Sequence, residues 1–169
     1  MQRTIIFFLC GVVLASSLLG TIFFRTQDVF SNTPIYTDDY AMHFSQCLST
    51  KRFFTFFGKC WAYDPFYLAG FPNGALANAD NKAWELFYFI LSPLLGYGFA
   101  FKLYVIAFLV TYPLFIYGAL RNFQFSRITA LIGSSLAVFF FHLSLCINFV
   151  FCGMISYVFV CFFSLYVMS

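Results

Sequence analysis

The chain has 169 residues and a net charge of +3 at pH 7, and 62% of its residues are hydrophobic while 9% are charged. Soluble domains are usually about half apolar and about a quarter charged. The 28 phenylalanines of this chain would be hard to bury in a soluble domain of its length. The basic residues form no run and no nucleic-acid-binding motif is present, so we expect no nucleic-acid partner. The composition predicts an integral membrane protein whose main partner is the lipid bilayer.

The first predicted transmembrane helix covers residues 5–24, an uncharged stretch between Arg3 and Arg25. About twenty apolar residues cross the hydrocarbon core of a bilayer as an α-helix. The alternative is a cleaved signal peptide with a small-residue site at 15–17. Because the apolar run continues past that site, we favour an uncleaved anchor and assign residues 1–25 to the first transmembrane helix.

Residues 26–98 form a polar loop, which holds most of the charge and a series of turn-forming Gly and Pro residues. The stretch 38–50 predicts a short amphipathic helix with Thr37 as its N-cap, because apolar and polar residues each recur at helical spacing. The apolar face consists of Tyr40, Phe44, Cys47 and Leu48, and the polar face consists of Asp39, His43, Gln46 and Thr50.

A second short helix is predicted at residues 83–91, which is too short to cross a bilayer and suits an interfacial or re-entrant segment. Lys82 and Glu85 are interpreted as a solvated pair at its start. The aromatic residues between 61 and 71 are expected to form a belt at the membrane surface. Cys47 and Cys60 either form a disulfide, if that side of the membrane is oxidising, or remain free thiols.

Residues 99–169 are expected to contain the second to fourth transmembrane helices. The second covers 101–120, with Lys102 snorkelling at its start and a kink at Pro113. The third covers 128 to about 147 and the fourth begins at about 149, close to the length that a bilayer requires, with Asn148 and Gly153 near the break. Since the chain ends inside an apolar run, we interpret it as the front part of a longer protein.

The predicted fold class is therefore all-α. It is a polytopic transmembrane bundle of about four spans, with a large exoplasmic loop that contains short amphipathic helices. Short basic segments stay on the cytoplasmic side of a membrane, and Arg3 and the turn between Arg121 and Arg127 are the short basic segments here. The N-terminus is then cytoplasmic and the loop lies outside.

Asp38, Asp39 and His43 are the candidate catalytic and metal-binding residues. On a helix, Asp39 and His43 are four residues apart and share one face. A carboxylate and an imidazole in this arrangement can act as a general base and its orienting partner, or they can bind a divalent cation such as Mg²⁺ or Mn²⁺ that bridges to a phosphate. The alternative is structural, because acids in a first helical turn complement the helix dipole, and Asp39 and His43 would then be a surface pair.

The layout resembles the GT-C type of integral-membrane glycosyltransferase, in which a first helix leads into a large exoplasmic loop whose opening helix carries an acidic motif. It is most similar to bacterial membrane proteins labelled "6-pyruvoyl-tetrahydropterin synthase related", which have a GT-C-like layout. The resemblance covers nearly the whole chain, and each motif is short. The matching residues are Tyr36 to Tyr40, Asp39 with His43, Trp61 to Pro65, Ala69 to Gly74, Asn81 to Leu86, and Tyr117 with Arg121.

This resemblance implies an enzyme of the bacterial inner (plasma) membrane that transfers a sugar from a polyprenyl-phosphate donor to an exoplasmic acceptor. Asp39 first and Asp38 second would assist the transfer. No clustered histidine zinc site of the pterin-synthase kind is present in the sequence. The sequence does not identify the donor sugar or the acceptor.

Two further hypotheses remain. A transporter or flippase component would carry ionisable residues inside its spans and broken helices in paired halves. Apart from His142, which is interpreted as structural, and Lys102 at the start of the second span, the predicted spans lack charged or histidine side chains. A non-catalytic membrane scaffold would use the loop to bind a partner protein.

Overall fold

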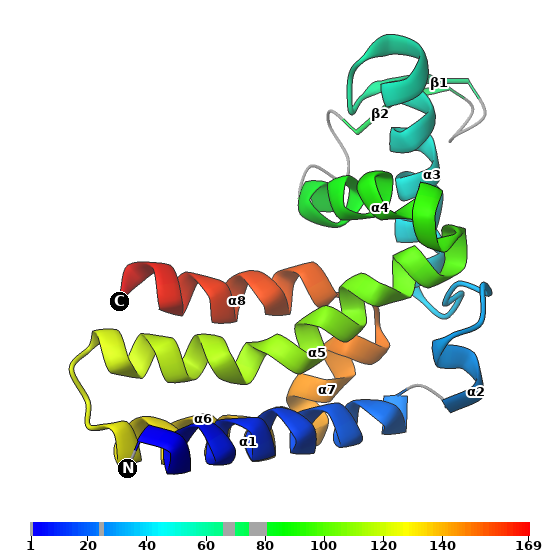
Figure 1. The fold of residues 1–169 in the computed structure, drawn as a ribbon. Coiled ribbons are helices and arrows are strands. Elements are labelled where there is room, and N and C mark those ends of the chain that lie inside the picture. Colours follow the sequence, from blue (N-terminus) through cyan, green and yellow to red (C-terminus); the bar gives the residue numbers. More distant parts are fainter. Residues whose placement is uncertain (1, 24–25, 66–69, 75–80) are drawn as a thin grey trace. The chain divides into compact units, whose positions relative to one another are not determined.

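The computed structural model describes residues 2–23, 26–65, 70–74 and 81–169. The chain divides into two compact units (Figure 1). The helical unit consists of Met1–Asp28 with Val105–Ser169, and the loop unit consists of Val29–Tyr104. The described residues are mostly helical, which confirms the all-α class.

The helical unit is built from apolar helices. Their bounds are α1 Gln2–Phe23, the short α2 Thr26–Val29, the C-terminal part of α5 Tyr97–Asn122, α6 Arg127–Phe141, α7 Ser144–Phe151 and α8 Ile155–Met168. Within the described residues, α5 is the one helix that is long and apolar enough to cross a membrane, with a mean hydropathy of 2.0. The apolar helices α6 and α8 have 15 and 14 residues.

The prediction of one continuous third span over 128–147 is wrong. Helix α6 ends at Phe141, and α7 begins at Ser144. The backbone N–H of His142 donates to the Phe139 carbonyl and that of Leu143 donates to the Phe140 carbonyl. Leu143 has an extended conformation, so the regular helical hydrogen-bond ladder stops there. The predicted break near Gly153 is confirmed, because Gly153 has a φ of 87°, a conformation that glycine adopts without strain.

Pro113 organises the packing of the helical unit. Proline has no N–H, so the carbonyl four residues earlier, that of Leu109, loses its partner within α5. The Ser16 hydroxyl of α1 donates a hydrogen bond to the Leu109 carbonyl. The Ser134 hydroxyl of α6 donates to the Pro113 carbonyl at 2.7 Å. Two neighbouring helices therefore hold α5 at its proline.

The core of the helical unit is aromatic. Phe108 and Tyr112 of α5 lie against Phe141 of α6 and Phe162 of α8, with the Tyr112 and Phe141 ring centroids 4.6 Å apart. Rings at this separation gain stabilisation beyond their buried area. The aromatic-rich sequence thus packs these three helices together.

The loop unit contains two longer helices and a small hairpin. Figure 1 shows α3 beside α4, with the two strands near the C-terminal end of α3. The bounds are α3 Asp39–Phe57, β1 Ala62–Asp64, β2 Phe71–Asn73 and α4 Lys82–Leu95, and the strands pair antiparallel with Tyr63 opposite Pro72. Both helices occur where the sequence predicts them but extend further, and the hairpin was not predicted.

Helix α3 ends at Gly58, whose φ of 64° places it in the left-handed conformation that commonly closes a helix. Its start differs from the prediction. Asp38, not Thr37, occupies the N-cap position, and the Asp38 side chain makes no capping hydrogen bond. The predicted Thr37 cap is therefore wrong, although the Thr37 carbonyl accepts a hydrogen bond from the Tyr40 N–H.

Trp84 lies at the centre of the loop unit. Its fully buried ring stacks on Phe101 at 4.5 Å, and its indole N–H donates to the Phe101 carbonyl at 3.1 Å. Tyr40 of α3 meets the same ring edge-on at 6.0 Å. The first turns of α5 therefore belong to the core of the loop unit.

The start of α5 is fixed by a side-chain cap. The Asn32 side-chain oxygen accepts a hydrogen bond from the Gly98 N–H at 2.8 Å. Glycine is needed there, since a Cβ atom at position 98 would collide with the Asn32 carbonyl oxygen. Lys102 does not snorkel as predicted: it is 1% exposed, and its ammonium donates to the carbonyl and hydroxyl of Ser31.

Candidate functional site

Asp38 and Asp39 lie at the start of α3. Asp39 is the first residue of the helix and is half-buried, whereas Asp38 is exposed. Among the residues that the structure describes, neither carboxylate takes part in an ion pair. The two acids therefore sit where the helix dipole stabilises their charge, while remaining open to a ligand.

The backbone of Asp38 is strained. Its φ of 45° and ψ of −131° fall outside the conformations that a side chain with a Cβ atom adopts easily. Such a residue costs on the order of 1–3 kcal/mol, and strain of this kind is concentrated at functional sites. The conformation turns the chain sharply just before α3 and sets the direction in which the helix begins.

His43 lies one turn after Asp39, but it is committed to other partners. The side chain is 7% exposed, and its Nδ1 lies 3.0 Å from the Asn81 amide nitrogen and 3.3 Å from the Gln46 amide oxygen. Its ring packs on Trp84 at 5.5 Å. The interpretation of Asp39 and His43 as a surface pair is therefore wrong, because His43 belongs to the interface between α3 and α4.

The predicted metal ligands do not form a cluster. Across the described part of the chain, no three His, Cys, Asp or Glu side chains come together in a group that could hold a metal ion. The imidazole of His43 instead engages Gln46 and Asn81. A shared Mg²⁺ or Mn²⁺ site at Asp38, Asp39 and His43 therefore stays a prediction.

Glu85 is a buried charged residue that the sequence interpretation misplaced. Its side chain is 1% exposed, and one carboxylate oxygen accepts hydrogen bonds from Thr50 at 2.6 Å and from Lys82 at 2.7 Å. The other oxygen, Oε1, is buried without a hydrogen-bond partner among the described residues. Lys82 and Glu85 do pair, but they are not the solvated pair that was predicted.

Asp64 is a second buried acid. It lies in β1, is 3% exposed, and binds the Arg52 guanidinium at 2.8 Å and the Ser49 hydroxyl at 3.3 Å. Both partners come from α3. These two contacts connect the hairpin to α3. The only sequence signal for them is that Asp64 is an isolated acid beside aromatic residues.

The two cysteines of the loop unit are free thiols. Cys47 is buried at 1% exposure and Cys60 is half-buried. Burial raises the pKa of the Cys47 thiol well above its ordinary value, and the nearby Glu85 carboxylate raises it further. Cys47 therefore stays protonated, and the disulfide alternative is not formed.

A groove of about 520 Å³ lies along the outer face of α3. It is lined by Tyr36, Ala41, Phe44, Ser45, Leu48, Ser49 and Arg52. Asp38 and Asp39 are not among the residues that line it. The groove combines aromatic rings with hydroxyl groups and the Arg52 guanidinium.

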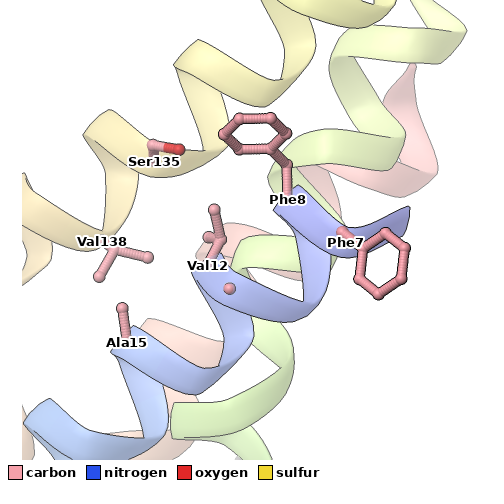
Figure 2. Close-up of a pocket in the computed structure, with 7 residues that line it drawn as sticks. Phe7, Phe8, Val12, Ala15, Ser135 and Val138 are labelled. Atoms are coloured by element: carbon pink, nitrogen blue, oxygen red, sulfur yellow. The ribbon is translucent and has the colours of Figure 1, made fainter. Parts of the chain in front are cut away.

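A second cavity, of about 380 Å³, lies between α1 and α6 in the helical unit. Figure 2 shows the side chains that line it, which are Phe7, Phe8, Val12 and Ala15 of α1 and Ser135 and Val138 of α6, together with Gly11. None of these lining residues is titratable. This cavity can hold an apolar chain but offers no group for acid–base chemistry.

Comparison with known proteins gives no match. No family model, no curated protein and no solved structure matches this chain. The case for a function therefore rests on the residues and the geometry described above.

Proposed function

We propose that this chain is a GT-C-like membrane glycosyltransferase that transfers a sugar from a polyprenyl-phosphate donor to an acceptor outside the membrane. The proposed location is the bacterial plasma membrane, with the N-terminus cytoplasmic and the loop unit on the exoplasmic side. Asp39 is the proposed general base, and Asp38 positions it.

The start of α3 is the observation that carries the proposal. A strained aspartate precedes a half-buried one, and neither carboxylate is used in an ion pair within the described residues. The other acids described in the loop unit, Asp64 and Glu85, are buried and already paired with Arg52 and Lys82. Asp39 is therefore the carboxylate of this unit best placed to accept a proton from a bound hydroxyl group.

The helical unit supports a polytopic membrane placement. In a bilayer no water can satisfy the carbonyl that a proline frees, so a neighbouring helix must do so. Ser16 supplies this partner to Leu109. The uncharged sequence after Arg127 supports the same placement for α6 to α8, with α7 and the breaks around it held by protein contacts.

The proposed reaction is a direct displacement at the anomeric carbon of the donor. The acceptor hydroxyl gives its proton to the Asp39 carboxylate while its oxygen forms a bond to that carbon. The bond between the carbon and the phosphate oxygen breaks, and its electron pair leaves with the polyprenyl phosphate. General-base assistance of this kind contributes roughly 10²–10⁴ in rate. No step is routed through a metal.

A transporter or flippase component is the second candidate, and one observation favours it. The helices α6 and α7 are separated at His142 and Leu143, and His142 Nε2 is buried without a hydrogen-bond partner among the described residues. An ionisable side chain at a helix break within an apolar segment is typical of transport pathways.

The test uses the full-length protein in proteoliposomes with a polyprenyl-phosphate sugar labelled in the sugar. Glycosyl transfer predicts that label appears in a water-soluble acceptor and that free polyprenyl phosphate is released in equal amount. Transport predicts that intact donor reaches the opposite leaflet with no release. Movement of intact donor without release would contradict the glycosyltransferase proposal.

A further inference from the structure

The C-terminal end of α3 and the hairpin carry large aromatic side chains on the surface. We call this set the aromatic tip. It consists of Phe56, Phe57, Trp61 and Tyr63, with exposed fractions of 73%, 60%, 47% and 65%. A protein surface in water rarely gathers several large apolar rings, so these rings are expected to contact something other than water.

A basic side chain accompanies these rings. The Lys59 ammonium lies 4.8 Å above the Trp61 ring, whereas the Lys51 ammonium turns toward Tyr97 and Ser92. Asp64, an acid of β1, is buried and already paired with Arg52. The tip therefore presents positive charge beside aromatic surface.

The acids of α3 lie at its opposite end. Asp39 begins the helix and Phe57 ends it, so the acidic and basic ends are separated by about 27 Å at the usual rise per residue. The tip is thus free of competing negative charge from the helix itself. A negatively charged partner would be attracted to the tip and not to the start of α3.

We infer that the aromatic tip docks on an anionic lipid surface. Trp and Tyr rings are enriched at the headgroup level of bilayers, and each lysine near an anionic leaflet contributes about 1 kcal/mol of attraction. The sequence of the loop unit is joined at both ends to apolar helices. If these helices lie in a membrane, the loop unit stays close to the membrane surface. This inference rests on the proposed membrane placement and is independent of the proposed sugar transfer.

Tryptophan fluorescence tests the docking directly. The chain has two tryptophans, and Trp84 is fully buried, so Trp61 is the reporter at the surface. The full-length protein is reconstituted in phosphatidylcholine vesicles with increasing phosphatidylglycerol, using lipids brominated near the headgroup. Bromolipid quenching should rise with the phosphatidylglycerol fraction and should be lost in the Trp61→Phe variant.

Charge variants test whether the tip is attracted to the lipid charge. Lys59→Gln should lower the ratio of docked to undocked tip about fivefold, and added salt should lower it as well. Arg127→Gln, at the exposed start of α6, is the matched control and should leave the quenching of Trp61 unchanged. A Trp61 that is quenched by aqueous iodide but not by bromolipid would overturn the inference, because its ring would then face water. Bromolipid quenching of Trp61 that changes neither with the phosphatidylglycerol fraction nor in Lys59→Gln would also overturn the inference.

Discussion

Ser16 in α1 completes a hydrogen bond that Leu109 in α5 cannot make within its own helix. Pro113 lacks the N–H that would normally bind the Leu109 carbonyl, and the Ser16 hydroxyl donates to it instead. A residue near the start of the chain thereby compensates for a proline almost a hundred positions later. This contact links the sequence of two predicted spans to their packing.

Ser16→Ala should destabilise the helical unit by about 1 kcal/mol, within the range measured for hydrogen bonds between membrane helices. Thermal unfolding in detergent is the measurement. Ser17→Ala is the matched control, because Ser17 bonds the carbonyl of Val13 in its own helix at 2.8 Å. Its effect should be close to zero. Equal losses in the two variants would contradict the role given to Ser16.

Pro113→Ala should make Ser16 dispensable. An alanine at 113 restores the N–H that binds the Leu109 carbonyl within α5, so that carbonyl no longer depends on the Ser16 hydroxyl. In a double-mutant cycle, Ser16→Ala should therefore cost much less in the Pro113→Ala background than in the native one. Additive losses would show that the proline does not create the need for Ser16.

Removing the two partners of the buried ion pair should have unequal effects. Lys82→Met leaves the Glu85 carboxylate buried and uncompensated, which should cost about 3 kcal/mol. Glu85→Gln should cost only about 1 kcal/mol, because the Lys82 side chain is 30% exposed and its ammonium can turn to water. Denaturant unfolding of both variants checks the order, and a larger loss for Glu85→Gln would refute it.

The stability of the loop unit should fall at alkaline pH. Burial raises the pKa of Cys47 well above the ordinary 9.0 and raises the pKa of Tyr88 above the ordinary 10.0. The unfolded chain therefore releases these protons at lower pH than the folded one, so stability is fully present below about pH 9 and declines above it. Cys47→Ala should flatten this decline. An unchanged slope in that variant would argue that Cys47 does not contribute.

Thiol labelling tests the orientation of the loop unit. On intact cells, a membrane-impermeant maleimide should label half-buried Cys60, whereas Cys47 at 1% exposure should react only after unfolding. Cys60→Ser should remove the labelling of native protein. Reaction of Cys60 only after the membrane is permeabilised would place the loop on the cytoplasmic side and contradict the proposed topology.

Local patterns predicted the existence of the main elements well. The periodicity around 38–50 indicated α3, the apolar runs indicated α1 and α5, and Gly153 marked a break. Helix ends were less accurate, because α3 continues to its glycine cap at 58 and α4 continues through Pro93. Such ends depend on packing against neighbours that a local pattern does not contain.

The polar face of α3 shows why the site could be predicted only in part. Its spacing indicated that Asp39, His43, Gln46 and Thr50 share a face, but not that the last three are buried. Their partners, Asn81 and Glu85, come from a segment more than thirty residues away. The sequence predicted that Asp39 lies at a helix start. No sequence pattern predicted the positive φ of Asp38.

Turnover by the Asp39→Asn variant of the full-length protein is the most direct test of the proposed function. The assay measures release of polyprenyl phosphate from a labelled sugar donor at equal protein expression. Asparagine keeps the shape of the side chain but cannot accept the proton, so turnover should fall roughly 10²–10⁴-fold. Asp38→Asn is the adjacent control and should lose less than Asp39→Asn. If Asp39 only complements the helix dipole, its loss is worth well under ~1 kcal/mol; near-normal turnover in Asp39→Asn would then contradict the assignment of this loop as the active site.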